Sequence, residues 1–117
     1  MNWNGAAGFL DVGTLDGIPP GTSLRVTFPD TALAVAVFNI DGRLFALGDE
    51  CERCGGSLGR GELLGPIVWC PDCDWAYDVR TGCVRNIPAL RTDAFEVRVL
   101  DSRVMVAPTV GLPPGVA

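Results

Sequence analysis

Two short cysteine pairs constrain the fold of this chain more than any other feature. The segments CERCG, which starts at Cys51, and CPDCD, which starts at Cys70, each hold two cysteines separated by two residues. A tight turn across that spacing aims both sulfurs at one point, and two such turns facing each other form a tetrahedral four-thiolate site. Thiolates in this geometry suit zinc, iron or an iron–sulfur cluster. The expected metal ligands are Cys51, Cys54, Cys70 and Cys73.

The competing interpretation is that these cysteines stay free and buried or form two disulfides. Four of the five cysteines fall into the paired spacing, which favours a metal site. The fifth, Cys83, has no partner at such a spacing. We expect Cys83 to be a small buried residue, because nothing in the sequence gives it a base or a second ligand.

The amino terminus, MNWNG, lacks the basic segment and the apolar stretch of a secretory signal. We therefore expect a cytoplasmic protein, and in a reducing cytoplasm paired cysteines bind metal more readily than they form disulfides. No apolar run of the sequence reaches the roughly 18 residues that a membrane span requires.

The charge of the chain bears on its partners. A net charge of −5 and a pI near 4.4 argue against nucleic acid, whose phosphates need a basic surface. An acidic surface suits transient docking onto a basic protein, and it equally suits simple solubility. The chain has no histidine, hence no Ser-His or Cys-His pair, and no phosphate-binding glycine loop. Hydrolytic and nucleotide-dependent catalysis therefore have no support in the sequence.

Short apolar segments separated by Gly, Pro and Asp predict an all-β fold. Residues 32–40 are almost wholly apolar, which is typical of a strand buried on both faces, and Asp41 and Gly42 then form a two-residue hairpin turn. No segment keeps a helical period over three turns. Further strands are expected near residues 8–12, 24–28, 43–47, 66–69, 75–79, 95–99 and 104–106.

The chain length of 117 residues supports one domain with a modest core. We expect a small β-sandwich or barrel over residues 1–107, with a hairpin-built metal-binding lobe at about residues 48–84. Residues 108–117 are rich in proline and glycine and are expected to form a loose tail.

The segments CERCGGSL (residues 51–58) and CPDCDWAYDVRTG (residues 70–82) carry a family resemblance. They resemble the two boxes of the Rieske ferredoxin family, Cys-x-His-x-Gly-x-x-Leu and Cys-x-x-His-Gly-Trp-x-Phe-Asp followed by Thr-Gly. The flanks AVFNIDGRLFAL and FEVRVLDSRVMV are also similar, so the resemblance spans nearly the whole chain and implies a Rieske fold. The matching positions outside the ligands are Gly55, Leu58, Trp75, Asp78, Thr81 and Gly82.

The chain departs from this pattern at both histidine ligands. Arg53 stands at the first histidine position with Cys54 beside it, and Cys73 stands at the second. Arginine stays protonated and has no lone pair for a metal. Because each missing histidine is matched by a cysteine, the change resembles a replacement of ligand type rather than a loss of the site.

The two C-x2-C turns resemble the knuckles of rubredoxin, in which four thiolates hold one iron, and those of zinc ribbons. Gly55 fits this interpretation, because the residue after such a knuckle often needs a left-handed backbone. Asp74 holds the equivalent place in the second turn, and Asp tolerates that region better than most residues. The spacing alone also allows a two-iron, two-sulfide cluster.

The leading hypothesis is a small electron carrier with a single iron on four cysteines. The resemblance implies weak, transient docking to a redox partner, an oxygenase or a flavin-dependent reductase or both, with no nucleic-acid or membrane partner. A second hypothesis is a redox-silent interaction or regulatory module stabilised by zinc. A third is an electron carrier with an all-cysteine 2Fe-2S cluster.

Four large side chains near the cysteines are expected to have ordinary roles. Arg53 and Arg60 are expected to be solvated, the alternative being that they moderate the negative charge of the centre. Trp69 and Trp75 are expected to pack the lobe, the alternative being that they relay electrons. Pro88 falls where the family has a loop that covers the cluster, or simply in a turn.

Overall fold

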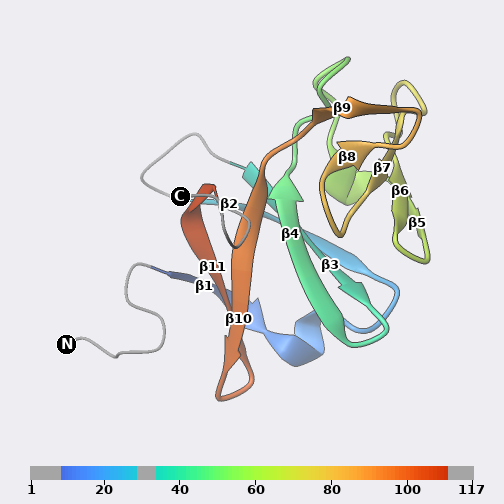
Figure 1. Ribbon diagram of the computed structural model, residues 1–117. Coiled ribbons are helices and arrows are strands. Elements are labelled where there is room, and N and C mark those ends of the chain that lie inside the picture. The colour runs from blue at the N-terminus through green and yellow to red at the C-terminus, as the bar shows by residue number, and fades with distance from the viewer. Residues whose placement is uncertain (1–8, 29–33, 111–117) are drawn as a thin grey trace.

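The computed structural model describes residues 9–28 and 34–110 and consists of two antiparallel β-sheets. The larger sheet has six strands in the order β1-β11-β10-β4-β3-β2, and the smaller has five in the order β5-β6-β7-β8-β9 (Figure 1). The larger sheet comprises β1 (Leu10–Thr14), β2 (Ser23–Thr27), β3 (Ala34–Ile40), β4 (Arg43–Gly48), β10 (Ala94–Leu100) and β11 (Arg103–Val110). The smaller comprises β5 (Glu62–Leu64), β6 (Ile67–Trp69), β7 (Ala76–Asp78), β8 (Cys83–Val84) and β9 (Ile87–Arg91).

The only helical segments among the described residues are two single 3-10 turns, η2 (Leu15–Gly17) and η3 (Leu58–Arg60). The predicted all-β class is confirmed. No helix in these two described stretches has the length and apolar character to cross a membrane.

Strand β3 is buried on both faces, as its apolar sequence predicts. Val35 and Val37 pack with residues of β4, β10 and β11 in one core. Ala36 and Phe38 point the other way, because successive side chains of a strand alternate, and they pack against the smaller sheet. One strand therefore joins the core of the larger sheet to the core beneath the cysteine loops.

Two hairpins of the larger sheet have two-residue turns with left-handed backbone, and the sequence predicted the one at Asp41 and Gly42. Asp41 and Gly42 both have positive φ (52° and 94°), as do Asp101 and Ser102 (50° and 65°). Two-residue turns of this kind match the right-handed twist of the flanking strands. They set the register of β3 with β4 and of β10 with β11.

The boundaries of the predicted lobe and tail differ in part from the observed strands. The smaller sheet continues to β9 and so ends beyond residue 84. Strands β5, β8 and β9 were not expected from the sequence. Pro88 lies within β9, an edge strand, where its missing N–H costs no ladder bond. Strand β11 continues to Val110, and the rest of the expected tail, residues 111–117, lies outside the described residues.

Candidate metal centre

The first cysteine loop, between β4 and η3, folds as a tight knuckle. The backbone N–H of Gly55 donates to the carbonyl of Cys51 at 2.9 Å, and the N–H of Cys51 donates to the carbonyl of Gly56 at 2.8 Å. Gly55 has φ +79°, a left-handed conformation that glycine adopts without a Cβ penalty. These two bonds close the turn and direct both cysteine side chains to the same side.

The second cysteine loop, between β6 and β7, repeats this turn. The N–H of Asp74 donates to the carbonyl of Cys70 at 2.9 Å, and the N–H of Cys70 donates to the carbonyl of Trp75 at 2.8 Å. Asp74 has φ +64°, so it holds the left-handed place that Gly55 holds in the first loop. The expected left-handed conformation is confirmed at both positions, and the two loops share one backbone design.

The two knuckles bring all four candidate ligands together. Their Sγ atoms all lie within 4.8 Å of one another. Each close pair links the two loops, with 3.7 Å between the Sγ atoms of Cys51 and Cys73 and 3.4 Å between those of Cys54 and Cys70. Cys51 and Cys70 are buried, Cys73 is half-buried and Cys54 is exposed, so the group lies at the surface with one side in the core. Cys83 lies in β8, outside this group.

Backbone N–H groups of the first knuckle point at the sulfurs. The N–H of Arg53 donates to the Sγ of Cys51, and the N–H of Gly56 donates to the Sγ of Cys54, both at 3.4 Å. Such donors stabilise thiolate charge and are typical of metal sites built on cysteine.

Tyr77, a buried residue of β7, places its side-chain hydroxyl beside one of these sulfurs. Its oxygen accepts the N–H of Glu52 at 2.8 Å and lies 3.2 Å from the Sγ of Cys51. Burial, and next the hydrogen bond with Cys51, raise the pKa of Tyr77 well above its usual value, so the hydroxyl stays protonated and donates to the sulfur. The sequence analysis predicted Tyr77 only as a strand residue and not as a partner of Cys51. The signal for that contact was the tyrosine hydroxyl at a position where the family pattern has phenylalanine.

The thiols differ in how readily they ionise. Burial pushes the pKa of Cys51 upward, but the Tyr77 hydroxyl and the backbone N–H groups of Cys54 and Arg53 outweigh it, and the resulting pKa is about 7. Burial raises the pKa of Cys70 to about 12, against the opposing N–H of Asp72. A bound cation displaces the protons from all such ligands, so metal affinity falls as the pH is lowered.

The site is anchored from below by a continuous apolar core. Cys51 and Cys70 pack with Leu58, Val68 and Tyr77. This cluster continues onto the outer face of β3 and to the end of β4. Two of the four candidate ligands, Cys51 and Cys70, are therefore held by the same core that joins the two sheets.

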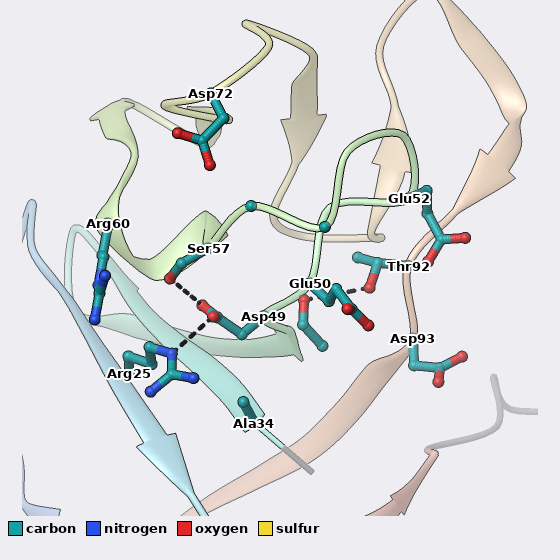
Figure 2. A pocket seen from close by; sticks show the side chains of 13 residues that line it. Arg25, Ala34, Asp49, Glu50, Glu52, Ser57, Arg60, Asp72, Thr92 and Asp93 are labelled. Atoms are coloured by element: carbon teal, nitrogen blue, oxygen red, sulfur yellow. Dashed lines mark hydrogen bonds and ion pairs between the residues drawn. The ribbon is translucent and has the colours of Figure 1, made fainter. Parts of the chain in front are cut away.

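A buried carboxylate fastens the first loop to the larger sheet. Asp49 accepts hydrogen bonds from Arg25 Nε at 2.9 Å, from Ser57 Oγ at 3.0 Å and from the N–H of Gly59 at 2.7 Å. It lies at the wall of a cavity of about 550 Å³ beside the first knuckle, and Figure 2 shows Arg60 and Asp72 around the same hollow. This role of Asp49 was not predicted from the sequence, because its partners lie in β2 and at η3.

Of the four large side chains near the cysteines, some behave as expected and Arg53 does not. Arg60 is exposed at the cavity, and Trp75 packs partly against the core, as expected. Trp69 is half-buried and lines a second, smaller hollow. Arg53 is exposed but does more than face solvent, because its guanidinium lies over the Trp75 ring.

The comparisons with known proteins agree with this architecture. The model of the Rieske [2Fe-2S] domain matches residues 8–108, and the chain belongs to this family. The chain is 38% identical over 100 residues to the biphenyl dioxygenase ferredoxin subunit of Pseudomonas sp. (strain KKS102), covering 84% of this chain and 90% of that protein. It is 32% identical over 100 residues to ferredoxin CarAc of Metapseudomonas resinovorans, covering 85% and 92%.

Solved structures show the same fold. A chain in the complex of reduced oxygenase and oxidized ferredoxin in carbazole 1,9a-dioxygenase matches with a TM-score of 0.83 and 30% identity, over 91% of this chain and 98% of that one. The ferredoxin of carbazole 1,9a-dioxygenase from Nocardioides aromaticivorans IC177 matches with a TM-score of 0.78 and 26% identity, over 86% and 98%. The expected membership of the Rieske family is confirmed.

Proposed function

We propose that this protein is a small electron carrier that serves an oxygenase and holds a single iron on Cys51, Cys54, Cys70 and Cys73. The observation that carries the proposal is the convergence of four cysteine sulfurs within 4.8 Å on a Rieske fold. The similarity to ferredoxin subunits of dioxygenases supports a carrier rather than a catalyst.

The donor set does not fit the cluster that the family description implies. A Rieske centre has two histidine ligands on one of its two irons. This chain contains no histidine, and Arg53, at the first histidine position, cannot donate a lone pair. We propose that Cys54 and Cys73 replace the two histidines, so that all four donors are thiolates.

The spacing of the sulfurs favours one ion. With metal–sulfur bonds of about 2.3 Å, a tetrahedral ion holds its sulfurs about 3.8 Å apart. The two closest pairs, at 3.4 and 3.7 Å, are near that value. A two-iron cluster would hold its thiolate pairs at opposite ends, roughly 5 Å or more apart. The upper limit of 4.8 Å therefore supports a single ion over an all-cysteine 2Fe-2S cluster.

Iron on four thiolates supplies a reversible one-electron couple without a change of ligands. The residues of this chain tune that couple. The N–H groups of Arg53 and Gly56 and the hydroxyl of Tyr77 donate to sulfur, and such bonds strengthen as negative charge accumulates. They favour the reduced state, and the shared core beneath Cys51 and Cys70 limits rearrangement.

The proposed partners are an oxygenase that accepts the electron and a flavin-dependent reductase that supplies it. The complex of oxygenase and ferredoxin in carbazole 1,9a-dioxygenase supports this role by analogy. Docking is expected to be weak and salt-sensitive, because the chain carries a net charge of −5 and interfaces of electron carriers are small. We propose a cytoplasmic location, where such a reductase and oxygenase would meet it.

Zinc is the second candidate, because a closed tetrahedral four-thiolate site also suits this ion. In that case the metal would be a structural staple for an interaction or regulatory module. The same sulfur geometry serves both ions, so metal analysis has to separate them.

The test starts with protein purified from its own host, because overexpressed four-thiolate sites often take up zinc. We expect one iron per chain, no acid-labile sulfide, and reversible loss of colour when a flavin-dependent reductase donates electrons, faster at low salt than at high salt. Two irons with matching sulfide would contradict the single ion. Colourless protein with one zinc, or irreversible bleaching of the iron form, would contradict the electron carrier.

A further inference from the structure

The two cysteine loops make a direct side-chain contact beside their sulfurs. The guanidinium carbon of Arg53 lies 5.7 Å from the centroid of the Trp75 ring. Arg53 lies inside the first knuckle, between Cys51 and Cys54, whereas Trp75 closes the second knuckle by accepting the N–H of Cys70 at 2.8 Å. The stacked pair therefore crosses from one loop to the other.

Both ends of Arg53 are engaged at the site. Its backbone N–H donates to the Sγ of Cys51 at 3.4 Å, and its side chain rests on the opposite loop. Within residues 9–28 and 34–110, no carboxylate forms an ion pair with its guanidinium, in contrast to Arg25, Arg80 and Arg103. The ring is thus the contact that fixes this positive charge.

We propose that Arg53 is a positioning residue: held on Trp75, it clamps the two loops together and keeps a positive charge beside the thiolates that raises the reduction potential. This inference rests on the proposed iron site. It departs from the expectation that Arg53 is simply solvated, because a cation over a tryptophan face is attracted to it and loses freedom to leave.

The direction of the effect follows from charge. Four thiolates leave a ferric ion with one net negative charge, and reduction adds a second. A nearby guanidinium therefore stabilises the reduced state more than the oxidised state, and its removal lowers the potential. Because Arg53 is exposed, salt screens this interaction, so the difference between wild type and a neutral variant shrinks as ionic strength rises.

The chain offers a matched control. Arg43 lies over the ring of Phe45 at the same distance, 5.7 Å, but at the start of β4 in the larger sheet. Arg43→Gln removes a positive charge and a stacked pair without touching the loops. Comparison with Arg53→Gln therefore separates a role at the site from a general effect of net charge.

The experiment measures two quantities: the reduction potential of the iron form and the rate at which the Co²⁺-loaded protein loses its metal to a chelator. Arg53→Gln is expected to lower the potential and to speed cobalt release roughly two- to fivefold, the size of an exposed cation–π contact. The values for Arg53→Lys are expected to fall between those of wild type and Arg53→Gln. Arg43→Gln is expected to match wild type. Trp75→Phe keeps a ring and is expected to change little.

A double substitution tests the clamp itself. Trp75→Leu is expected to reproduce both effects and to leave Arg53→Gln with little further effect in that background. The proposal is overturned if Arg53→Gln equals Arg43→Gln in both readouts, or if its effect is the same with and without the Trp75 ring. Failure of the wild-type iron form to cycle reversibly would contradict the proposed function and the effect on potential, while cobalt release would still decide the clamp.

Discussion

The Tyr77 hydroxyl lies 3.2 Å from the Sγ of Cys51 while its oxygen accepts the N–H of Glu52 at 2.8 Å. With its acceptor position occupied by an N–H, the hydroxyl is free to donate to the sulfur. The buried side chain of Tyr77, in the strand that follows the second loop, therefore holds both the candidate ligand Cys51 and the backbone of the first loop. The stabilisation of negative charge on the Cys51 sulfur therefore depends on how Tyr77 packs in β7.

Tyr77→Phe tests that link. Loss of the donor is expected to weaken stabilisation of the reduced state by about 1 kcal/mol, which lowers a one-electron potential by on the order of 40 mV. The N–H of Glu52 also loses its partner, so the free energy of unfolding is expected to fall by about 1–3 kcal/mol. Voltammetry and denaturant unfolding measure the two effects. An unchanged potential at full metal content would show that the hydroxyl does not act on the sulfur.

The four ligands are tested by single serine substitutions, with Cys83→Ser as the matched control. Each change at Cys51, Cys54, Cys70 or Cys73 is expected to weaken metal binding sharply, because serine is a poor ligand for a soft four-thiolate site. Cys83 lies in β8 outside the group, so its substitution is expected to leave metal content nearly unchanged. Metal analysis of the purified variants decides.

Loss of metal is also expected to destabilise some segments of the chain more than others. Hydrogen exchange of the metal-free protein is expected to rise more in residues 48–84 than in β3 or β10, because the proposed metal would link the two cysteine loops of the lobe, whereas the larger sheet has its own core. Metal loss caused by Cys83→Ser, or retention in one of the four ligand variants, would refute the ligand set.

Substitutions at the left-handed residues of the two knuckles are expected to change stability in opposite directions. Gly55→Ala places a Cβ at φ +79°, where it meets only a Glu50 side-chain oxygen at 3.7 Å, so the cost is backbone strain of about 1–2 kcal/mol. Asp74→Gly relieves such strain at φ +64° and is expected to stabilise the protein by up to about 1 kcal/mol.

Because Asp74→Gly also removes a charge beside the thiolates, Asp74→Asn is the control that keeps a residue tolerant of left-handed backbone. Thermal unfolding of the metal-loaded variants gives the comparison. Equal effects of the Gly and Asn substitutions would assign the gain to charge and not to conformation.

Local sequence signals predicted much of this structure. The paired cysteines, the hairpin at Asp41 and Gly42, and the double burial of β3 each depend on residues close together in the chain, where spacing and alternation are informative. The left-handed places of Gly55 and Asp74 followed from the same knuckle pattern.

The elements that the sequence did not reveal lack such signals. All five residues of β9 are exposed, so the strand shows no alternation, and Pro88 argues against it; pairing with β8 alone makes it a strand. Tyr77 and Asp49 acquire their roles through partners that are distant in sequence, Cys51 and Arg25 respectively. Single-sequence periodicity carries no information on such pairs.

The last prediction compares two ion pairs of equal length and different burial. Asp49 and Asp11 each lie 2.9 Å from an arginine, but the side chain of Asp49 is 4% exposed and that of Asp11 is 42% exposed. Asp49→Asn places a buried amide group, which is itself a donor, among the three groups that donate to Asp49. It is expected to lower the free energy of unfolding by about 3 kcal/mol. Asp11→Asn removes an exposed, screened pair and is expected to cost no more than about 1 kcal/mol.

Because Asp49 binds both Ser57 and Gly59, its loss should also loosen the first cysteine loop and speed metal release to a chelator, whereas Asp11→Asn should not. Denaturant unfolding in high salt sharpens the contrast, since salt screens the exposed pair and leaves the buried one nearly intact. Equal losses of stability for the two variants, or normal metal release from Asp49→Asn, would show that this carboxylate does not fasten the metal-binding loop to the larger sheet.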